Sequence, residues 1–129
     1  MIHELARSDD RDEAARTLAR WLREETARDA ADARGNVPNL IEALGEVGNE
    51  IASSALVDAL EDERHDLASK TLIVQQLARL DHGDRERALP AVMRFARDTE
   101  DAPVHDDFEA ALRREALAAA DETGRRLRL

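Results

Sequence analysis

Apolar residues recur along this chain at the spacing of one helix face, with charged and small polar residues between them. Ala14, Leu18, Trp21 and Leu22 form the first such face, and later segments repeat the spacing with Leu, Ile and Val. The pattern predicts a short turn at 2–7 and helices over residues 10–33, 38–47, 50–61, 65–80, 85–97 and 102–123. No segment alternates with the period of a strand.

Capping residues and helix breakers support these boundaries. Asp10, followed three residues later by Glu13, is typical of a helix start, and Pro38 suits the first turn of the next helix. Gly48-Asn49 is expected to end that helix, and Asp84 to cap the fifth. Pro90 predicts a kink or a late start in the fifth helix. We expect Pro103 to open the last helix, Gly124 to stop it, and residues 125–129 to form a frayed basic tail.

The apolar positions between residues 40 and 93 repeat at an offset of 33 residues. The matched pairs are Leu40/Ile73, Ile41/Val74, Leu44/Leu77, Val47/Leu80, Ala55/Ala88, Leu56/Leu89 and Leu60/Met93. Such a period is the signature of a solenoid, in which each unit buries its apolar face against the next. We therefore expect an all-α superhelix of three antiparallel helix pairs: 10–33 with 38–47, 50–61 with 65–80, and 85–97 with 102–123.

Two stretches resemble the short HEAT-type repeats of prokaryotic proteins, which also occur in phycobilisome lyase-like proteins. They are Leu44–Asn49 continuing into Ala55–Asp62, and Leu77–Asp84 continuing into Ala88–Met93. The resemblance accounts for Pro90, because this family often has proline at that helix position. It implies one HEAT-like domain, with a capping region at 1–37, clear repeats at 38–98, a degenerate helix at 99–124 and a tail at 125–129.

The composition agrees with a helical protein. Hydrophobic residues make up 43% of the chain but aromatic residues only 2%, so the core must consist of Leu, Ile, Val and Ala. The absence of Cys excludes disulfides and thiolate chemistry. No signal peptide or membrane span is recognisable, which favours a cytoplasmic protein, and the preference for Arg over Lys suggests a GC-rich prokaryotic source.

Charge is distributed unevenly. The net charge is −10, and residues 35–62 contain six acids and no Lys or Arg. Binding nucleic acid requires clustered cations, so this distribution favours a basic protein partner instead. The acidic candidates for partner binding are Glu42, Glu46, Glu50, Asp58, Glu61 and Asp62. The alternative is an ordinary solvated face.

Further candidates follow from the HEAT resemblance, which implies that the second helix of each pair lines a concave face. On that basis Ser69, Gln76, Glu109 and Arg113 join Glu42 and Glu46 as partner-binding residues. Trp21 is a separate candidate, because tryptophan is enriched at interface hot spots. Packing against the second helix pair would explain Trp21 equally well.

The sequence offers little for catalysis. Ser53 and Ser54 lie in a helix pattern without a nucleophile elbow, the histidines are dispersed, and no glycine-rich phosphate loop occurs. A metal site is conceivable only at Asp81, His82 and Asp84 or at His105, Asp106 and Asp107, where turns and helix caps are the simpler explanation. We therefore expect no catalytic residue, metal or cofactor.

Together these features predict a non-catalytic module that binds another protein, for example an immunity-type or antitoxin-like inhibitor of a basic partner. Two alternatives remain open at this point. One is a structural scaffold that self-associates into a homo-oligomer through its end helices. The other is a metal-dependent enzyme that uses one of the Asp/His clusters.

Overall fold

The fold was obtained as a computed structural model that describes residues 2–27, 36–79 and 85–128, and every regular element within these ranges is an α-helix. The all-α prediction is thus confirmed. The helices are α1 (Ile2–Ala6), α2 (Arg11–Ala27), α3 (Val37–Val47), α4 (Glu50–Leu60), α5 (Leu67–Leu77), α6 (Arg85–Asp101) and α7 (Asp107–Leu127).

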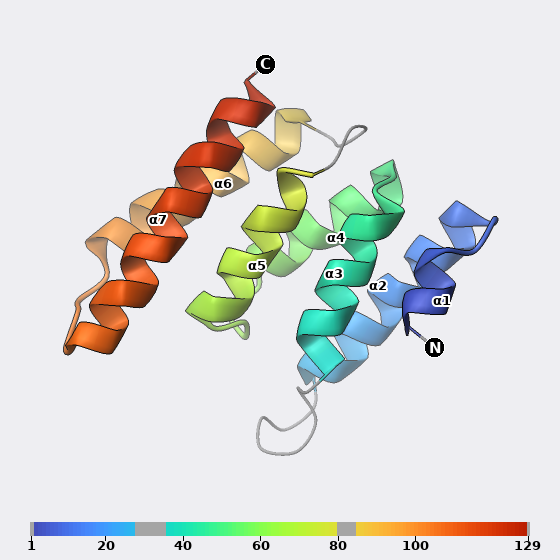
Figure 1. The fold of residues 1–129 in the computed structure, drawn as a ribbon, viewed down its shortest axis with the longest axis horizontal. Helices are drawn as coiled ribbons and strands as arrows, with labels where there is room; N and C mark the ends of the chain where they lie inside the picture. Colours follow the sequence, from blue (N-terminus) through green and yellow to red (C-terminus); the bar gives the residue numbers. More distant parts are fainter. Residues whose placement is uncertain (1, 28–35, 80–84, 129) are drawn as a thin grey trace.

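The helices are stacked as three antiparallel pairs in two layers (Figure 1). The pairs are α2 with α3, α4 with α5, and α6 with α7, as predicted. Helices α2, α4 and α6 form the first layer. Helices α3, α5 and α7 form the second layer, in which α3 contacts α5 and α5 contacts α7. Each pair therefore covers an apolar face of the next pair, as in a solenoid.

Several predicted helix ends are confirmed by their caps. Asp10 Oδ1 accepts a hydrogen bond from the Glu13 amide at 3.1 Å, and Pro38 lies in the first turn of α3. Gly48 ends α3 in the left-handed conformation, with φ of 67°, and its amide donates to the Leu44 carbonyl. Asn49 then caps α4 by accepting from the Ala52 amide at 2.9 Å. These local signals are sufficient to place the α3–α4 hairpin.

The helices α5 and α6 differ from their predicted bounds. α5 begins at Leu67 rather than at residue 65, because Asp66 Oδ1 accepts from the Ser69 amide at 2.8 Å and caps the helix there. α6 begins at Arg85, as predicted, but ends at Asp101 rather than at residue 97. Pro90 lies inside it, so of the two alternatives for Pro90, a kink or a late start, the late start is wrong. Residues 28–33, 80 and 84, where other helix ends and a cap were predicted, lie outside the described residues.

The last helix shows the largest errors of prediction. It begins at Asp107, capped by Asp106, whose Oδ1 accepts from the Glu109 amide at 2.7 Å, and not at Pro103. It passes through Gly124 to Leu127, so residues 125–127 of the expected frayed tail are helical, and Leu127 is packed at 8% exposure while Arg125 and Arg126 are exposed. Phe108, in the first turn of this helix, is 71% exposed.

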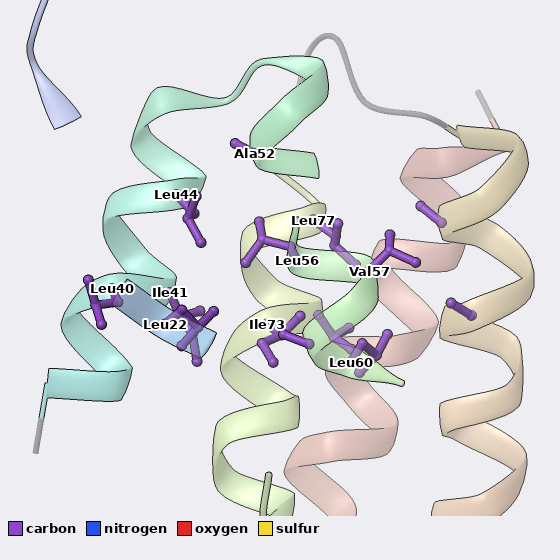
Figure 2. Packing of buried hydrophobic residues seen from close by; sticks show 14 of the residues in the cluster. Leu22, Leu40, Ile41, Leu44, Ala52, Leu56, Val57, Leu60, Ile73 and Leu77 are labelled. Atoms are coloured by element: carbon purple, nitrogen blue, oxygen red, sulfur yellow. The ribbon is translucent and has the colours of Figure 1, made fainter. Parts of the chain in front are cut away.

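The 33-residue repeat is realised in the core of the second layer. Leu40 and Leu44 of α3, and Ile73 and Leu77 of α5, are each at most 1% exposed. Figure 2 shows Leu77 close to Leu56 and Val57 of α4, whereas Leu40 lies farther from α4, on the other side of α3. In the layer of α4 and α6 one matched pair differs, because Leu60 is 3% exposed but Met93 is 44% exposed.

The N-terminal end of the stack is closed by α1, which contacts both α2 and α3. Arg11, at the start of α2, holds this end together through its guanidinium group. The group donates to the carbonyl of Ala6 at 2.9 Å and to the carbonyls of Glu46 and Val47 at 3.0 and 2.9 Å. Arg11 therefore caps the C-terminus of α3, whose last carbonyls lack helical partners.

Candidate binding groove

The acidic segment 35–62 is largely neutralised by arginines from other parts of the chain. The ion pairs are Arg7–Glu46 (3.3 Å), Arg87–Asp58, Arg94–Glu61 (3.3 Å) and Arg64–Asp62 (2.7 Å). Only Arg64 is close to its partner in sequence, and the other three cations come from the α1–α2 turn and from α6. The segregation of charge along the sequence is therefore not a segregation in space.

The Asp62–Arg64 pair is the tightest of these interactions. The Arg64 side chain and amide donate to the Asp62 carboxylate, which lowers its pKa from 3.8 to about 2 even though partial burial acts in the opposite direction. Of the acidic candidates, Glu42 and Glu50 are exposed and form no ion pair with a described residue. These two carboxylates are the part of the predicted acidic surface that remains available to a partner.

Two of the contacts between α4 and α6 join residues 33 positions apart. Arg87 Nη1 donates to Ser54 Oγ at 3.0 Å, and Arg94 Nη1 donates to Glu61 Oε2 at 3.3 Å. Adjacent units thus place arginines of α6 beside polar and acidic residues of α4. The contacts explain why α4 carries acids without cations of its own. These contacts join the second and third pairs, and the partner-binding role of Asp58 and Glu61 stays a prediction.

The candidates on the second helices differ in exposure and in their contacts. Gln76 is 5% exposed and lies beneath Gly45 of α3, which corrects the expectation that it lines an open face. Ser69 is half-buried at the start of α5. Glu109 accepts from the His105 amide at 2.9 Å, and Arg113 donates to the Glu100 carbonyl at the opposite end of the connection. Glu109 and Arg113 therefore belong with the third pair and not with Glu42 and Glu46.

Trp21 is half-buried on α2 and packs against the hydrophobic core. Its ring borders a shallow depression that also involves Ile2 of α1 and Leu40 of α3. These contacts account for the tryptophan by packing at the N-terminal end of the stack. The binding role considered for Trp21 stays a prediction.

A groove of about 670 Å³ lies between the second and third helix pairs. Its floor consists of Leu60, Ala91, Phe95 and Thr99, all less than 10% exposed. Pro103 and Val104, in the connection between α6 and α7, form an exposed apolar rim, and Leu67 and Leu112 complete the apolar lining. The volume lies within the range of about 300–1,000 Å³ that is typical of binding sites.

Unequal helix lengths create this groove. α4 and α5 each have 11 residues, whereas α6 has 17 and α7 has 21. At 1.5 Å per residue, α5 spans roughly 16 Å and α7 roughly 31 Å. The end of α6 and the start of α7 consequently extend past the second pair, as the lower left of Figure 1 shows. The groove occupies the corner between this overhang and the end of the second pair.

Charged side chains surround the apolar floor of the groove. Glu61, Glu63, Asp98 and Glu109 contribute carboxylates, and Lys70, Arg94 and Arg113 contribute cations. Two of the cations are already engaged, because Arg94 pairs with Glu61 and Arg113 binds the Glu100 carbonyl. Glu63 and Asp98 are exposed and form no ion pair with a described residue, so carboxylates dominate the free polar groups.

The groove shows little that is typical of a catalytic site. Its lining contains no serine, and the Nε2 atom of the buried His65 lies 3.3 Å from the hydroxyl of Thr26 on α2. Ser53 is fully buried, and Ser54 accepts from Arg87. No three His, Asp or Glu side chains are grouped for metal binding in residues 2–27, 36–79 and 85–128. The Asp81, His82 and Asp84 cluster lies outside these residues.

None of the described helices is both long enough and apolar enough to cross a membrane. No family model matches the chain, and no significant match was found among curated proteins or among solved structures. The HEAT resemblance thus stays a prediction, and the groove has to be interpreted from its own geometry.

The groove was not anticipated from the sequence, although two signals for it are present there. Residues 98–109 contain six carboxylates and no Lys or Arg, and they enclose Pro103, Val104 and Phe108. From the sequence, residues 99–124 are interpreted as a degenerate helix, with Glu109 as a partner-binding candidate and His105, Asp106 and Asp107 as a conceivable metal cluster. The other signal is the greater length of the last two helices, which depended on boundaries that were predicted incorrectly.

Proposed function

We propose that this protein is a non-catalytic module that binds another protein, and that the groove between the second and third helix pairs is its binding site. The observation that carries this proposal is the overhang of α6 and α7, which leaves an apolar floor and an exposed apolar rim beside the second pair. Val104 is 38% exposed on that rim. Apolar surface of this kind, bordered by polar residues, is typical of interaction sites.

The arrangement of polar groups also favours binding over catalysis. A catalytic site needs a nucleophile, acid or base that converges with others on one reacting atom. In the groove, Arg94, Glu109 and Arg113 are instead committed to contacts that hold the third pair in place. The free groups, Lys70, Glu63 and Asp98, are suited to contacts at the edge of an interface.

The proposal moves the expected site away from the acidic segment. Four of its six carboxylates already bind arginines within the chain, so a partner would have to displace those contacts before binding there. Exposed ion pairs are worth little individually, but breaking several of them would leave less affinity for the partner. In the groove, Glu63 and Asp98 are available without such an exchange.

Site-specific photo-cross-linking tests this function. A photoreactive amino acid is placed at Val104, on the rim of the groove, and at Met93, which is 44% exposed on α6 but does not line the groove. In an extract of the native organism, we expect the Val104 probe to cross-link one discrete partner protein and the Met93 probe to give no such product.

Three outcomes would contradict the proposal. The first is the same product from both positions, which would indicate non-specific capture. The second is no product from either position. The third is a covalent dimer of this chain as the main product, which would favour the self-associating scaffold.

A further inference from the structure

We infer that the occupant of the groove is a cationic amphipathic helix of the partner protein. This inference rests on the proposed function and adds the shape and charge of what binds. It is argued from the helix lengths around the groove, from its apolar floor, and from the carboxylates of residues 98–109.

The shape of the groove suits a helix. Along most of their length, α6 and α7 are covered by α4 and α5, but the second pair ends before the overhang does. The side of the overhang that faces the second pair therefore lacks a neighbouring helix. A partner helix that packs along this side would occupy the position that longer α4 and α5 helices would fill. It would bury Val104 and Leu112, as those longer helices would.

The floor of the groove defines the apolar face of the partner. Leu60 comes from α4, Phe95 from α6, and Leu112 from α7, so apolar contacts are offered by three helices. A helix placed in an apolar groove usually contributes side chains at positions i, i+3 or i+4, and i+7. The partner helix is therefore expected to carry Leu, Ile, Met or Phe at this spacing.

Charge around the groove selects a cationic helix. Segment 98–109 contributes six carboxylates, those of Asp98, Glu100, Asp101, Asp106, Asp107 and Glu109, and the groove adds Glu61 and Glu63. Of these eight, Glu61, Glu63, Asp98 and Glu109 line the groove, against three lining cations, Lys70, Arg94 and Arg113. When the carboxylates outside the lining are counted, the neighbouring Arg97 and Arg114 count as well, which leaves eight carboxylates against five cations. Lys and Arg beside the apolar face of the partner would meet this excess of carboxylates, which would speed association and favour the correct partner.

The specificity of the groove can be measured with a display library of helical peptides in which all surface positions are varied. The library is selected on the wild-type protein, after removal of peptides that bind a Val104→Arg/Leu112→Arg variant. We expect the selected peptides to combine an apolar i, i+3 or i+4, i+7 face with Lys or Arg beside it. Circular dichroism of the variant confirms that it is folded.

The contribution of charge is then isolated with two matched double variants. Glu63→Gln/Asp98→Asn removes two carboxylates that line the groove, and Glu42→Gln/Glu50→Gln removes two exposed carboxylates elsewhere. Both lower the net negative charge equally. For a selected peptide, fluorescence anisotropy should show affinity reduced about ten-fold in the first variant and less than about two-fold in the second. The difference should shrink at high salt.

The inference is overturned if no peptide is enriched, if the selected peptides are acidic or lack an apolar face, or if the two charge variants weaken binding equally. These results are separate from the cross-linking test of the proposed function. A discrete partner cross-linked through Val104 together with a failed peptide selection would retain the binding groove and reject the cationic helix.

Discussion

Two glycines inside helices are expected to respond in opposite ways to replacement by alanine. Gly45 lies in α3 and Gly124 in α7, and both are buried. In a helix interior, alanine is more favourable than glycine by about 1 kcal/mol. Both substitutions therefore gain the same stability from helix propensity. The two sites differ only in what the added methyl group would contact.

At Gly124, no heavy atom other than those of its chain neighbours and of the surrounding helix backbone lies within 4 Å of the position that a Cβ atom would occupy. At Gly45, that position is 2.1 Å from Gln76 Oε1, 2.9 Å from Gln76 Cδ and 3.0 Å from Gln76 Cβ. Carbon atoms in ordinary contact are about 3.5–4.0 Å apart, so the Gln76 side chain would have to move. It is 5% exposed, and its Oε1 accepts from Arg79 at 2.8 Å.

The net effects follow from these contacts. Gly124→Ala is expected to stabilise the protein by about 0.5–1 kcal/mol, which raises Tm by about 2–4 °C. Overpacking a core typically costs about 1–3 kcal/mol, and displacing a buried amide from its hydrogen bond adds to that cost. After the helix term is subtracted, Gly45→Ala is expected to destabilise the protein by about 1–2 kcal/mol.

Urea unfolding followed by far-UV circular dichroism measures both free energies, provided that the dependence on urea concentration is unchanged. The double variant Gly45→Ala/Gln76→Ala tests the mechanism, because removal of Oε1 and Cδ should reduce the cost of Gly45→Ala by about 1 kcal/mol relative to its cost in the wild type. If Gly45→Ala were as stable as Gly124→Ala, the close approach of α3 and α5 at Gln76 would be wrong.

Three other changes test contacts elsewhere in the stack by the same unfolding assay. Arg11→Ala removes three hydrogen bonds to carbonyls and should lower the free energy of unfolding by about 1–2 kcal/mol. The control Arg20→Ala, at an exposed position of the same helix, should stay within about 0.5 kcal/mol of wild type. Equal losses of stability in the two variants would exclude the capping role. Arg64 lowers the pKa of Asp62 from 3.8 to about 2, so the stability that Arg64 adds is present above pH 4 and is lost as the pH falls through 2. If the wild type stayed more stable than Arg64→Ala at the lowest pH, the pairing would be contradicted. Thr123→Val removes a buried hydrogen bond of 3.0 Å to the Val74 carbonyl and should cost about 1 kcal/mol, and an unchanged stability would show that this link between α7 and α5 contributes nothing.

Local signals in the sequence determined where most helices begin. Asp10, Asn49 and Gly48 act within a few residues of themselves, because a cap needs only a side chain or a backbone conformation at a helix end. The periodicity of Leu, Ile and Val likewise determined the core of the second layer. Those features are properties of short stretches, so the sequence alone is enough to find them.

The end of α7 was not predictable in this way. Gly124 normally favours a helix end, but Leu127 is buried and Thr123 binds the Val74 carbonyl, so packing against α5 extends the helix through the glycine. Pro90 is similar, because it lies inside α6 despite its local preference to break a helix. Burial of apolar side chains between pairs outweighs the weak preference of a single residue.

By itself, the sequence determined that this protein is a stack of three helix pairs with an excess of acidic residues. Only the tertiary structure decided which acidic residues form ion pairs and where the unequal helix lengths leave a groove. Arg87 and Arg94 pair with Asp58 and Glu61 because stacking makes α4 and α6 neighbours. Segment 98–109 borders a groove because α6 and α7 extend past the end of the second pair. Ion pairs and grooves depend on distances between elements far apart in the chain, which no local pattern encodes.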